Sequence, residues 1–99
     1  AEMAARHEPC RSLVWYAAHA FDAVPNEASL LACHAKSHTA EVYRFVARTS
    51  TEVHGGMGFT DLLGLQYWFK RIGFARQVLG GPEAVRAEAA ALQGWTKAA

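Results

Sequence analysis

Apolar side chains recur along the chain at spacings of three and four residues, which is the periodicity of an amphipathic helix. Proline and glycine interrupt this pattern at a few places and divide the chain into helical segments. The segments predict four helices joined by short connections, and no stretch alternates in the manner of a strand. We therefore expect an all-α, up-and-down four-helix bundle that forms one domain over residues 1–99.

The first helix is predicted from about Cys10 to Val24, and its start can lie upstream of Pro9. Pro25 ends it, and the Asn26 side chain is expected to cap a second helix that continues to about His54. About 28 residues make a helix of roughly 42 Å, which must lie lengthwise against the other helices. The predicted apolar stripe of the first helix is Leu13, Ala17, Ala20, Phe21 and Val24, and that of the second is Leu31, Ala35, Val42, Phe45, Val46, Thr49 and Val53.

Glycines stop the second helix and separate it from the rest of the chain. The run 55–58 contains three of them, and glycine enters the left-handed conformations that end helices. Thr60 is then expected to cap a third helix from about Asp61 to Val78. Pro82 suits the first position of a fourth helix, which is predicted to reach about Gln93. The weak stripe of the fourth helix is Ala84, Val85, Glu88, Ala89 and Leu92.

Composition narrows the classes of function. Alanine supplies 20 of the 99 residues, which favours helices. The formal charge of +1 lacks the positive excess of a nucleic-acid-binding protein, so we expect no nucleic-acid partner. No apolar run is long enough to span a membrane, and we expect no membrane association. The two cysteines are far apart and form no disulfide framework, so a cytoplasmic location is predicted.

For several side chains, a chemical role and a purely structural role account for the sequence pattern equally well. His34 and His38 lie one helical turn apart with Glu41 nearby, a spacing that a zinc site can use. The metalloprotease pattern needs glutamate directly after the first histidine, where this chain has Ala35, so we expect no metal site. A metal-binding bundle built on these residues is kept as a third hypothesis, behind the two that are described below.

The cysteines and aromatic residues favour structural roles. Cys10 and Cys33 fall inside predicted helices rather than at a helix N-terminus, so buried structural cysteine is preferred to a nucleophile. The aromatic run 67–69 predicts packing in the core or at an interface, as do the remaining large aromatics: Trp15, Tyr16 and Trp95.

The glycine run is the strongest local signal for a ligand. Backbone N–H groups at a glycine-rich turn before a helix can receive a phosphate or pyrophosphate. The spacing fits neither the Rossmann fingerprint nor the P-loop, since no strand precedes it and no Gly-Lys-Ser/Thr sequence ends it. A plain helix-to-helix turn accounts for the residues equally well.

The amino-acid sequence resembles that of the C-terminal helical domain of the acyl-CoA dehydrogenases over almost its whole length. The resemblance is carried by Ala35-Lys36, the run from Glu52 to Thr60, Lys70-Arg71, Gly80 and Arg86. It implies an FAD-dependent flavoprotein of fatty acid metabolism that oxidises an acyl-CoA to its trans-2-enoyl form. It also implies that a first helix of the domain lies upstream of Ala1, so that the chain is a partial domain that is inactive alone.

The resemblance further implies an FAD site in the glycine segment. The implied FAD-binding residues are Glu52, Gly55, Gly56, Gly58, Phe59 and Thr60. The family usually has glutamine at the position of Glu52, and a carboxylate there loses an amide donor to the dinucleotide.

The catalytic base of the family is missing from the matching position. Alignment on Gly80 and Arg86 places Leu79 where many members have the glutamate that removes the α-proton, so we expect no catalytic residue in this chain. The implied partners are acyl-CoA in the complete enzyme and a second subunit, either an identical copy or a partner acyl-CoA dehydrogenase subunit. The competing hypothesis is a non-catalytic helical association module that has lost the base.

Overall fold

The computed structural model describes residues 1–60 and 62–96, and it is built almost entirely from helices. None of the described residues forms a β-strand, which confirms the predicted all-α class. The elements are α1 (Glu2–Ala23), α2 (Pro25–Val53), the short 3₁₀ helix η1 (Gly55–Phe59), α3 (Leu65–Gln77) and α4 (Pro82–Leu92). No helix in the described part of the chain is long and apolar enough to cross a membrane.

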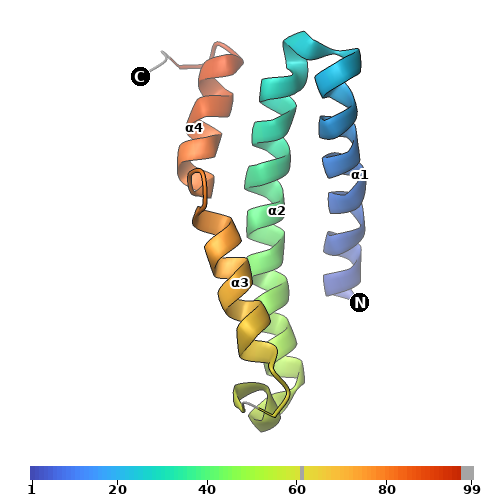
Figure 1. The fold of residues 1–99 in the computed structure, drawn as a ribbon, viewed down its shortest axis with the longest axis vertical. Helices are drawn as coiled ribbons and strands as arrows, with labels where there is room; N and C mark the ends of the chain where they lie inside the picture. The colour runs from blue at the N-terminus through green and yellow to red at the C-terminus, as the bar shows by residue number, and fades with distance from the viewer. Residues whose placement is uncertain (61, 97–99) are drawn as a thin grey trace.

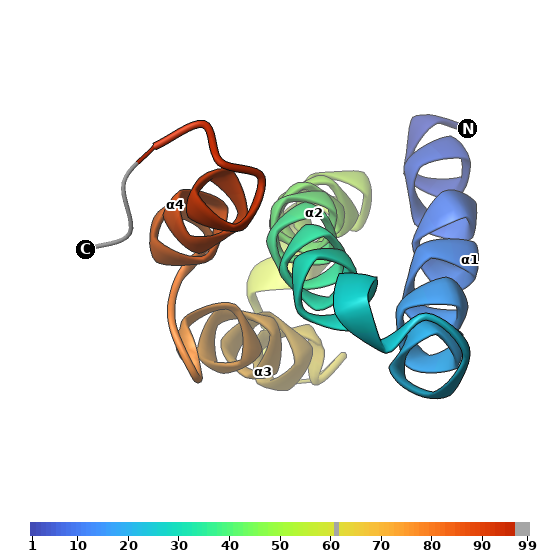
Figure 2. The ribbon, with the colours of Figure 1, turned by 90° about the horizontal axis from the view of Figure 1, so that it is seen from above.

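The long helix α2 is the centre of the bundle. α1 packs antiparallel along one side of α2, while α3 and α4 follow one another along the other side (Figures 1 and 2). The four predicted helices are therefore present, and two of them form a single interrupted column. A helix of 29 residues has a length of about 43 Å, close to the 47 Å long axis of the molecule. The length of α2 thus sets the length of the domain.

Proline and glycine determine where the helices begin, and they displace two predicted caps. α2 begins at Pro25, with Val24 as its N-cap and no side-chain cap, so the predicted cap by Asn26 is wrong. The fixed backbone angle of proline prepares it for the first helical position, which leaves Asn26 inside the first turn. α1 begins well upstream of Pro9 and continues through it.

The third helix begins later than predicted. Its N-cap is Gly64, with φ +66°, and Thr60 instead closes η1 by donating its hydroxyl hydrogen to the Met57 carbonyl oxygen at 2.8 Å. The cap predicted at Thr60 is therefore wrong, because α3 begins five residues further on, at Leu65. Asp61, predicted in the first turn of this helix, lies outside the described residues.

The core consists mainly of small side chains, which let the helices approach one another closely. The buried residues of the four helices are Cys10, Ala20, Cys33, Ala35, Ser37, Ala40, Val42, Ala47, Pro82, Val85 and Ala89. Parts of the predicted stripes are not buried: Phe21 is 75% exposed and Val53 is 71% exposed. Phe21 lines an open groove with small side chains of α2 such as Ala28 and Ala32, and Val53 lies in the last turn of α2.

The large aromatic residues lie on the surface of this chain. Trp68 is 68% exposed, Trp95 is 76% exposed, and α3 has no buried residue at all. Core packing is therefore excluded for the aromatic run of α3, and interface packing is the interpretation that remains. Exposed apolar area on this scale is typical of surfaces that other protein covers.

Leu79, in the turn between α3 and α4, has a backbone conformation that favours glycine. Its φ is +63°, and its side chain is 97% exposed. The left-handed conformation costs a residue with a Cβ about 1–2 kcal/mol. No buried contact of the side chain offsets that cost.

We predict that Leu79→Gly raises the free energy of unfolding by about 0.5–1 kcal/mol, because removal of the Cβ strain exceeds the added entropy of the unfolded chain. Thermal or urea unfolding measures the effect. Val78→Gly is the matched control, since Val78 has φ −63° and gains nothing from glycine. A lower stability for Leu79→Gly than for the unaltered chain contradicts the assignment of strain.

Candidate functional site

The glycine segment folds back against the last turn of α2. Gly55 has φ +64°, the left-handed conformation that ends the α-helix, and η1 continues from it to Phe59. The His54 ring nitrogen Nδ1 lies 2.6 Å from the Ser50 carbonyl oxygen, and the Thr60 backbone N–H bonds the Met57 carbonyl oxygen at 3.1 Å. The segment is thus a tight 3₁₀ turn with its own hydrogen bonds.

Two of its glycines are required for different reasons. Gly58 is buried, and a Cβ at this position would lie 2.6 Å from the Thr51 carbonyl oxygen and 3.2 Å from the His54 Cβ. Gly58 therefore permits the close return of the turn onto α2. Gly56 is exposed, and no atom of the described residues lies within 4 Å of its Cβ position. Packing within the chain gives no reason for glycine at position 56.

The turn does not sit at the positive end of a helix. Because α3 begins only at Leu65, the N–H groups of residues 55–58 are not the first N–H groups of that helix. They follow the C-terminus of α2, which carries the negative end of the helix dipole. The sequence-based argument for an anion site at a helix N-terminus is therefore wrong in its geometry.

Glu52 lies in the last turn of α2, and it is exposed. A carboxylate near a helix C-terminus is unfavourable by about 0.3–1 kcal/mol, because the carbonyl groups there carry negative partial charge. Glu27 lies in the first turn of the same helix, where the positive end of the helix dipole makes a carboxylate favourable. The two glutamates thus form an internal comparison of the same side chain at both ends of α2.

Leu79, at the position that the resemblance assigns to the family's base, lies away from the glycine segment. Leu79 follows α3, and the glycine segment precedes it, so the 13 residues of α3, about 20 Å of helix, separate the two (Figure 1). The chain does not bring these two predicted regions together.

A network of charges that the sequence reasoning missed fixes the turn after α3. Lys36 of α2 donates hydrogen bonds from its ammonium group to the carbonyl oxygens of Ala75 and Arg76, at the C-terminal end of α3. A cation there stabilises the end of the helix. Glu41 pairs with Arg76 at 2.9 Å and lies 3.8 Å from Arg86 of α4. The sequence feature that could have indicated this network is Ala35-Lys36, which is part of the family resemblance but was given no structural role.

The contacts of Glu41 and His34 do not favour a metal site. The carboxylate of Glu41 is directed to arginines, while the His34 Nε2 lies 3.4 Å from the Gln93 amide nitrogen. Within residues 1–60 and 62–96, no three His, Cys, Asp or Glu side chains are grouped to hold a metal ion.

Both cysteines are buried and free, as a structural role requires. Burial raises the pKa of the Cys10 thiol, and burial followed by the charge of Glu88 raises the pKa of the Cys33 thiol. A raised pKa disfavours the thiolate, which is the nucleophilic form. These environments argue against cysteine catalysis.

Comparison with known proteins assigns the domain. The fold is an all-α bundle with a glycine turn after its longest helix, and the family model for the acyl-CoA dehydrogenase C-terminal domain matches residues 1–93. The chain belongs to the acyl-CoA dehydrogenase C-terminal domain family. No curated protein and no solved structure matches it.

We predict that Gly58→Ala lowers the free energy of unfolding by about 1–3 kcal/mol, because its Cβ would collide with the Thr51 carbonyl oxygen. Gly56→Ala is the control, since its Cβ enters open space and its stability should change by less than about 0.5 kcal/mol. Chemical denaturation compares the two. Equal losses of stability are inconsistent with this packing.

Proposed function

We propose that this chain acts as the C-terminal helical domain of an FAD-dependent acyl-CoA dehydrogenase, in which it supplies part of the FAD site and subunit contacts. The observation that carries the proposal is the family match over residues 1–93 together with the open backbone at Gly56. The complete protein oxidises an acyl-CoA to its trans-2-enoyl form in cytoplasmic fatty acid metabolism. When bound, FAD accepts the hydride that leaves the β-carbon of the thioester.

The residues of the turn are compatible with an FAD molecule that approaches from outside the chain. Gly55 and Gly56 are exposed, and a side chain at position 56 would occupy the space beside the backbone where a ligand approaches. Gly58 acts indirectly, because it allows the turn that presents residues 55 and 56. The backbone of Phe59 and the hydroxyl of Thr60 complete the proposed contact, with the Thr60 oxygen still able to accept a hydrogen bond.

Glu52 is the residue least suited to the proposed site. Its charge lies beside negative helix-terminal carbonyl groups and, in the holoprotein, near the negative pyrophosphate of FAD. A glutamine at this position removes the charge and adds an amide donor.

We predict that Glu52→Gln raises the free energy of unfolding by about 0.3–1 kcal/mol and increases FAD affinity severalfold in the complete protein. Thermal melts and titration of FAD into apoprotein measure the two effects. Glu27→Gln is the control, because it removes a favourable charge from the first turn of α2 and should lower stability while FAD affinity stays constant. Tighter FAD binding by both variants argues against a local role of Glu52.

A second candidate function is a non-catalytic association module of the same family. The observation that favours it is Leu79, which is 97% exposed and has no group that accepts a proton, at the position that the resemblance assigns to the usual base. Such a module keeps the helices and the subunit contacts without the reaction.

Flavin content separates the two candidates. The complete protein, purified without added cofactor, should be yellow with the absorption bands of bound flavin if the first candidate is right. Reduction of that flavin by an acyl-CoA then tests whether another part of the protein or a second subunit provides the base. A colourless protein that does not bind FAD on titration supports the association module instead.

Exposed apolar side chains support self-association under either candidate. Most of the exposed large residues occur on α1, α3 and the turns, with Trp15, Tyr67, Trp68 and Phe74 each at least 66% exposed. We predict that sedimentation of the chain shows dimers or larger assemblies at micromolar concentration, because such surfaces gain free energy when they leave water. A stable monomer that melts in one cooperative transition contradicts this prediction.

A further inference from the structure

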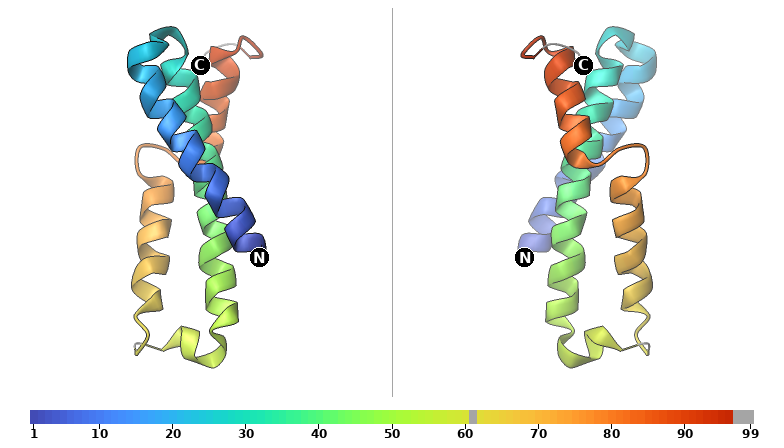
Figure 3. Two further views of the ribbon diagram at one scale, coloured as in Figure 1. Left: turned by 90° about the vertical axis from the view of Figure 1, so that its right-hand side faces the viewer. Right: turned by 90° about the vertical axis from the view of Figure 1, so that its left-hand side faces the viewer.

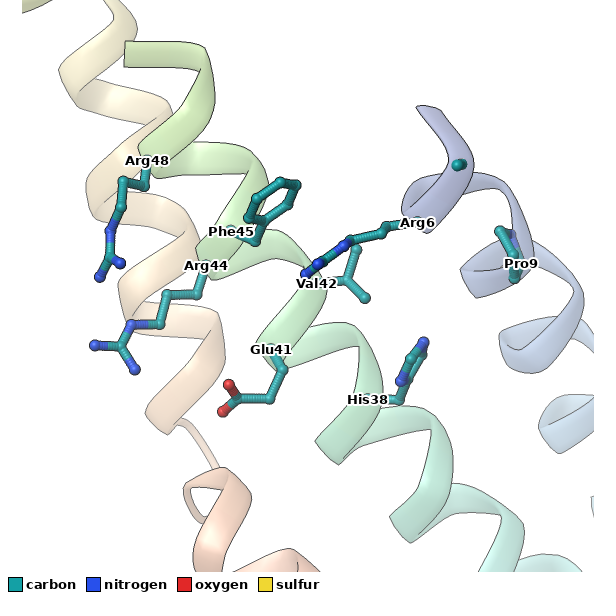
Figure 4. Close-up of a pocket in the computed structure, with 9 residues that line it drawn as sticks. Arg6, Pro9, His38, Glu41, Val42, Arg44, Phe45 and Arg48 are labelled. Atoms are coloured by element: carbon teal, nitrogen blue, oxygen red, sulfur yellow. The ribbon is translucent and has the colours of Figure 1, made fainter. Parts of the chain in front are cut away.

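A groove between the N-terminal half of α1 and the middle of α2 has no role in the proposed function (Figure 4). Its cavity volume is about 710 Å³, within the range of small-molecule sites. The lining residues are Ala5, Arg6 and Pro9 of α1 with His38, Glu41, Val42, Arg44, Phe45 and Arg48 of α2. The glycine segment does not line it.

The groove exists because α1 crosses α2 at an angle (Figure 3). Two contacts hold the N-terminal end of α1 to α2: the Tyr43 hydroxyl lies 2.7 Å from the His7 Nδ1, and the Ser50 hydroxyl donates to the Met3 sulfur at 3.5 Å. The α1 wall carries the small Ala5 and the compact Pro9, which leave space above α2. The groove is therefore formed before any ligand arrives.

The groove has an apolar floor, and two arginines lie at one side of it. The floor contains Val42, which is buried, and Phe45, which is half-buried. Figure 4 shows the Arg44 and Arg48 side chains extending from α2 to the same side of this floor. Both arginines are exposed, and no described residue forms an ion pair or hydrogen bond with either guanidinium group.

Glu41, which lines the groove, does not neutralise the two free arginines. Its carboxylate is paired with Arg76 at 2.9 Å and lies 3.8 Å from Arg86. Its charge is thus balanced by α3 and α4. Arg44 and Arg48 therefore face the solvent with their positive charges uncompensated, one helical turn apart on α2.

Arg6 determines the kind of ligand that fits. Its guanidinium carbon lies 4.1 Å from the centroid of the Phe45 ring, and its Nη2 is 2.7 Å from the Glu2 carboxylate. Figure 4 shows this side chain reaching from α1 across the floor. A straight helix lying in the groove would meet it, whereas a small molecule has room on either side.

We propose that this groove binds a small amphipathic oxyanion, either a carboxylate or a phosphate monoester joined to an apolar chain. The oxyanion lies against Arg44 and Arg48, whose planar guanidinium groups suit bidentate contacts to carboxylate and phosphate oxygens. The apolar chain lies along Val42 and Phe45. Neither an inorganic anion nor a neutral alcohol satisfies both parts of the site.

The test is titration of the 99-residue chain with decyl phosphate and with decanoate, followed by calorimetry and by backbone amide chemical shifts. We expect saturable binding with the largest shifts in residues 5–9 and 38–48, and much weaker binding of decanol, inorganic phosphate and decyltrimethylammonium. The stronger of the two anionic probes identifies the preferred headgroup. Shifts spread over α3, or equal binding of the cationic amphiphile, would mean general detergent binding and would overturn the proposal.

The double variant Arg44→Gln, Arg48→Gln should weaken binding of the better probe at least tenfold, because two charge-assisted contacts are lost. Arg71→Gln is the matched control, since it removes one exposed arginine from α3 and should leave affinity unchanged. Circular dichroism checks that the variants keep their helices. Unchanged affinity in a folded double variant refutes the site, and so does a dimer of the unaltered chain that prevents binding. If a variant fails to fold, the map of chemical shift changes in the unaltered chain still tests the site.

Discussion

A single helix, α2, carries the principal contacts of the domain, and small side chains decide how closely the other helices approach it. Alanine and serine form much of its buried surface, and Pro82 and Cys10 are the largest side chains that are fully buried. Close backbone approach of this kind gives dense packing but removes little apolar area from water per residue. Most of the large apolar side chains lie outside this core, on the surface of the chain.

Because burial contributes little around α3, polar contacts hold this helix in place. Lys36 binds the last carbonyl groups of α3, while Glu41 joins Arg76 and Arg86 from the two helices of the same column. Arg76 is only 14% exposed, so its pair with Glu41 is screened less by water than a surface ion pair. The turn between α3 and α4 is thereby attached to the middle of α2, and its geometry depends on α2 rather than on its own side chains.

The sequence predicted the helices well because proline and glycine act locally. Pro25 and Pro82 begin helices in the structure, as their fixed φ leads one to expect. The errors came from competition between local signals: Pro25 takes the first helical position and leaves Asn26 inside the first turn, and Thr60 closes η1 while α3 begins only at Leu65. Phe21 satisfied the helical spacing but lines an open groove beside small side chains of α2, which periodicity alone does not reveal.

The candidate site was predicted only in part. The residues of the glycine turn were identified by resemblance, yet their helix-terminus geometry was wrong because the intervening residues delay α3 until Leu65. The groove beside Phe45 had no sequence signal, since it depends on the angle at which α1 crosses α2. Pairing of Glu41 with arginine also required the fold, because its partners are more than 30 residues away in the chain.

The side chain of Leu79 contributes nothing to the packing of the domain. Its backbone conformation is maintained by the flanking helices and by the contacts of Lys36 with the end of α3, and its side chain lies almost wholly in solvent. Exchange of one residue for another at this site therefore leaves the packing of the helices unchanged. A position of this kind accepts any side chain that tolerates the left-handed backbone, so a polar or charged residue here would add a new group to the surface while the core stays the same.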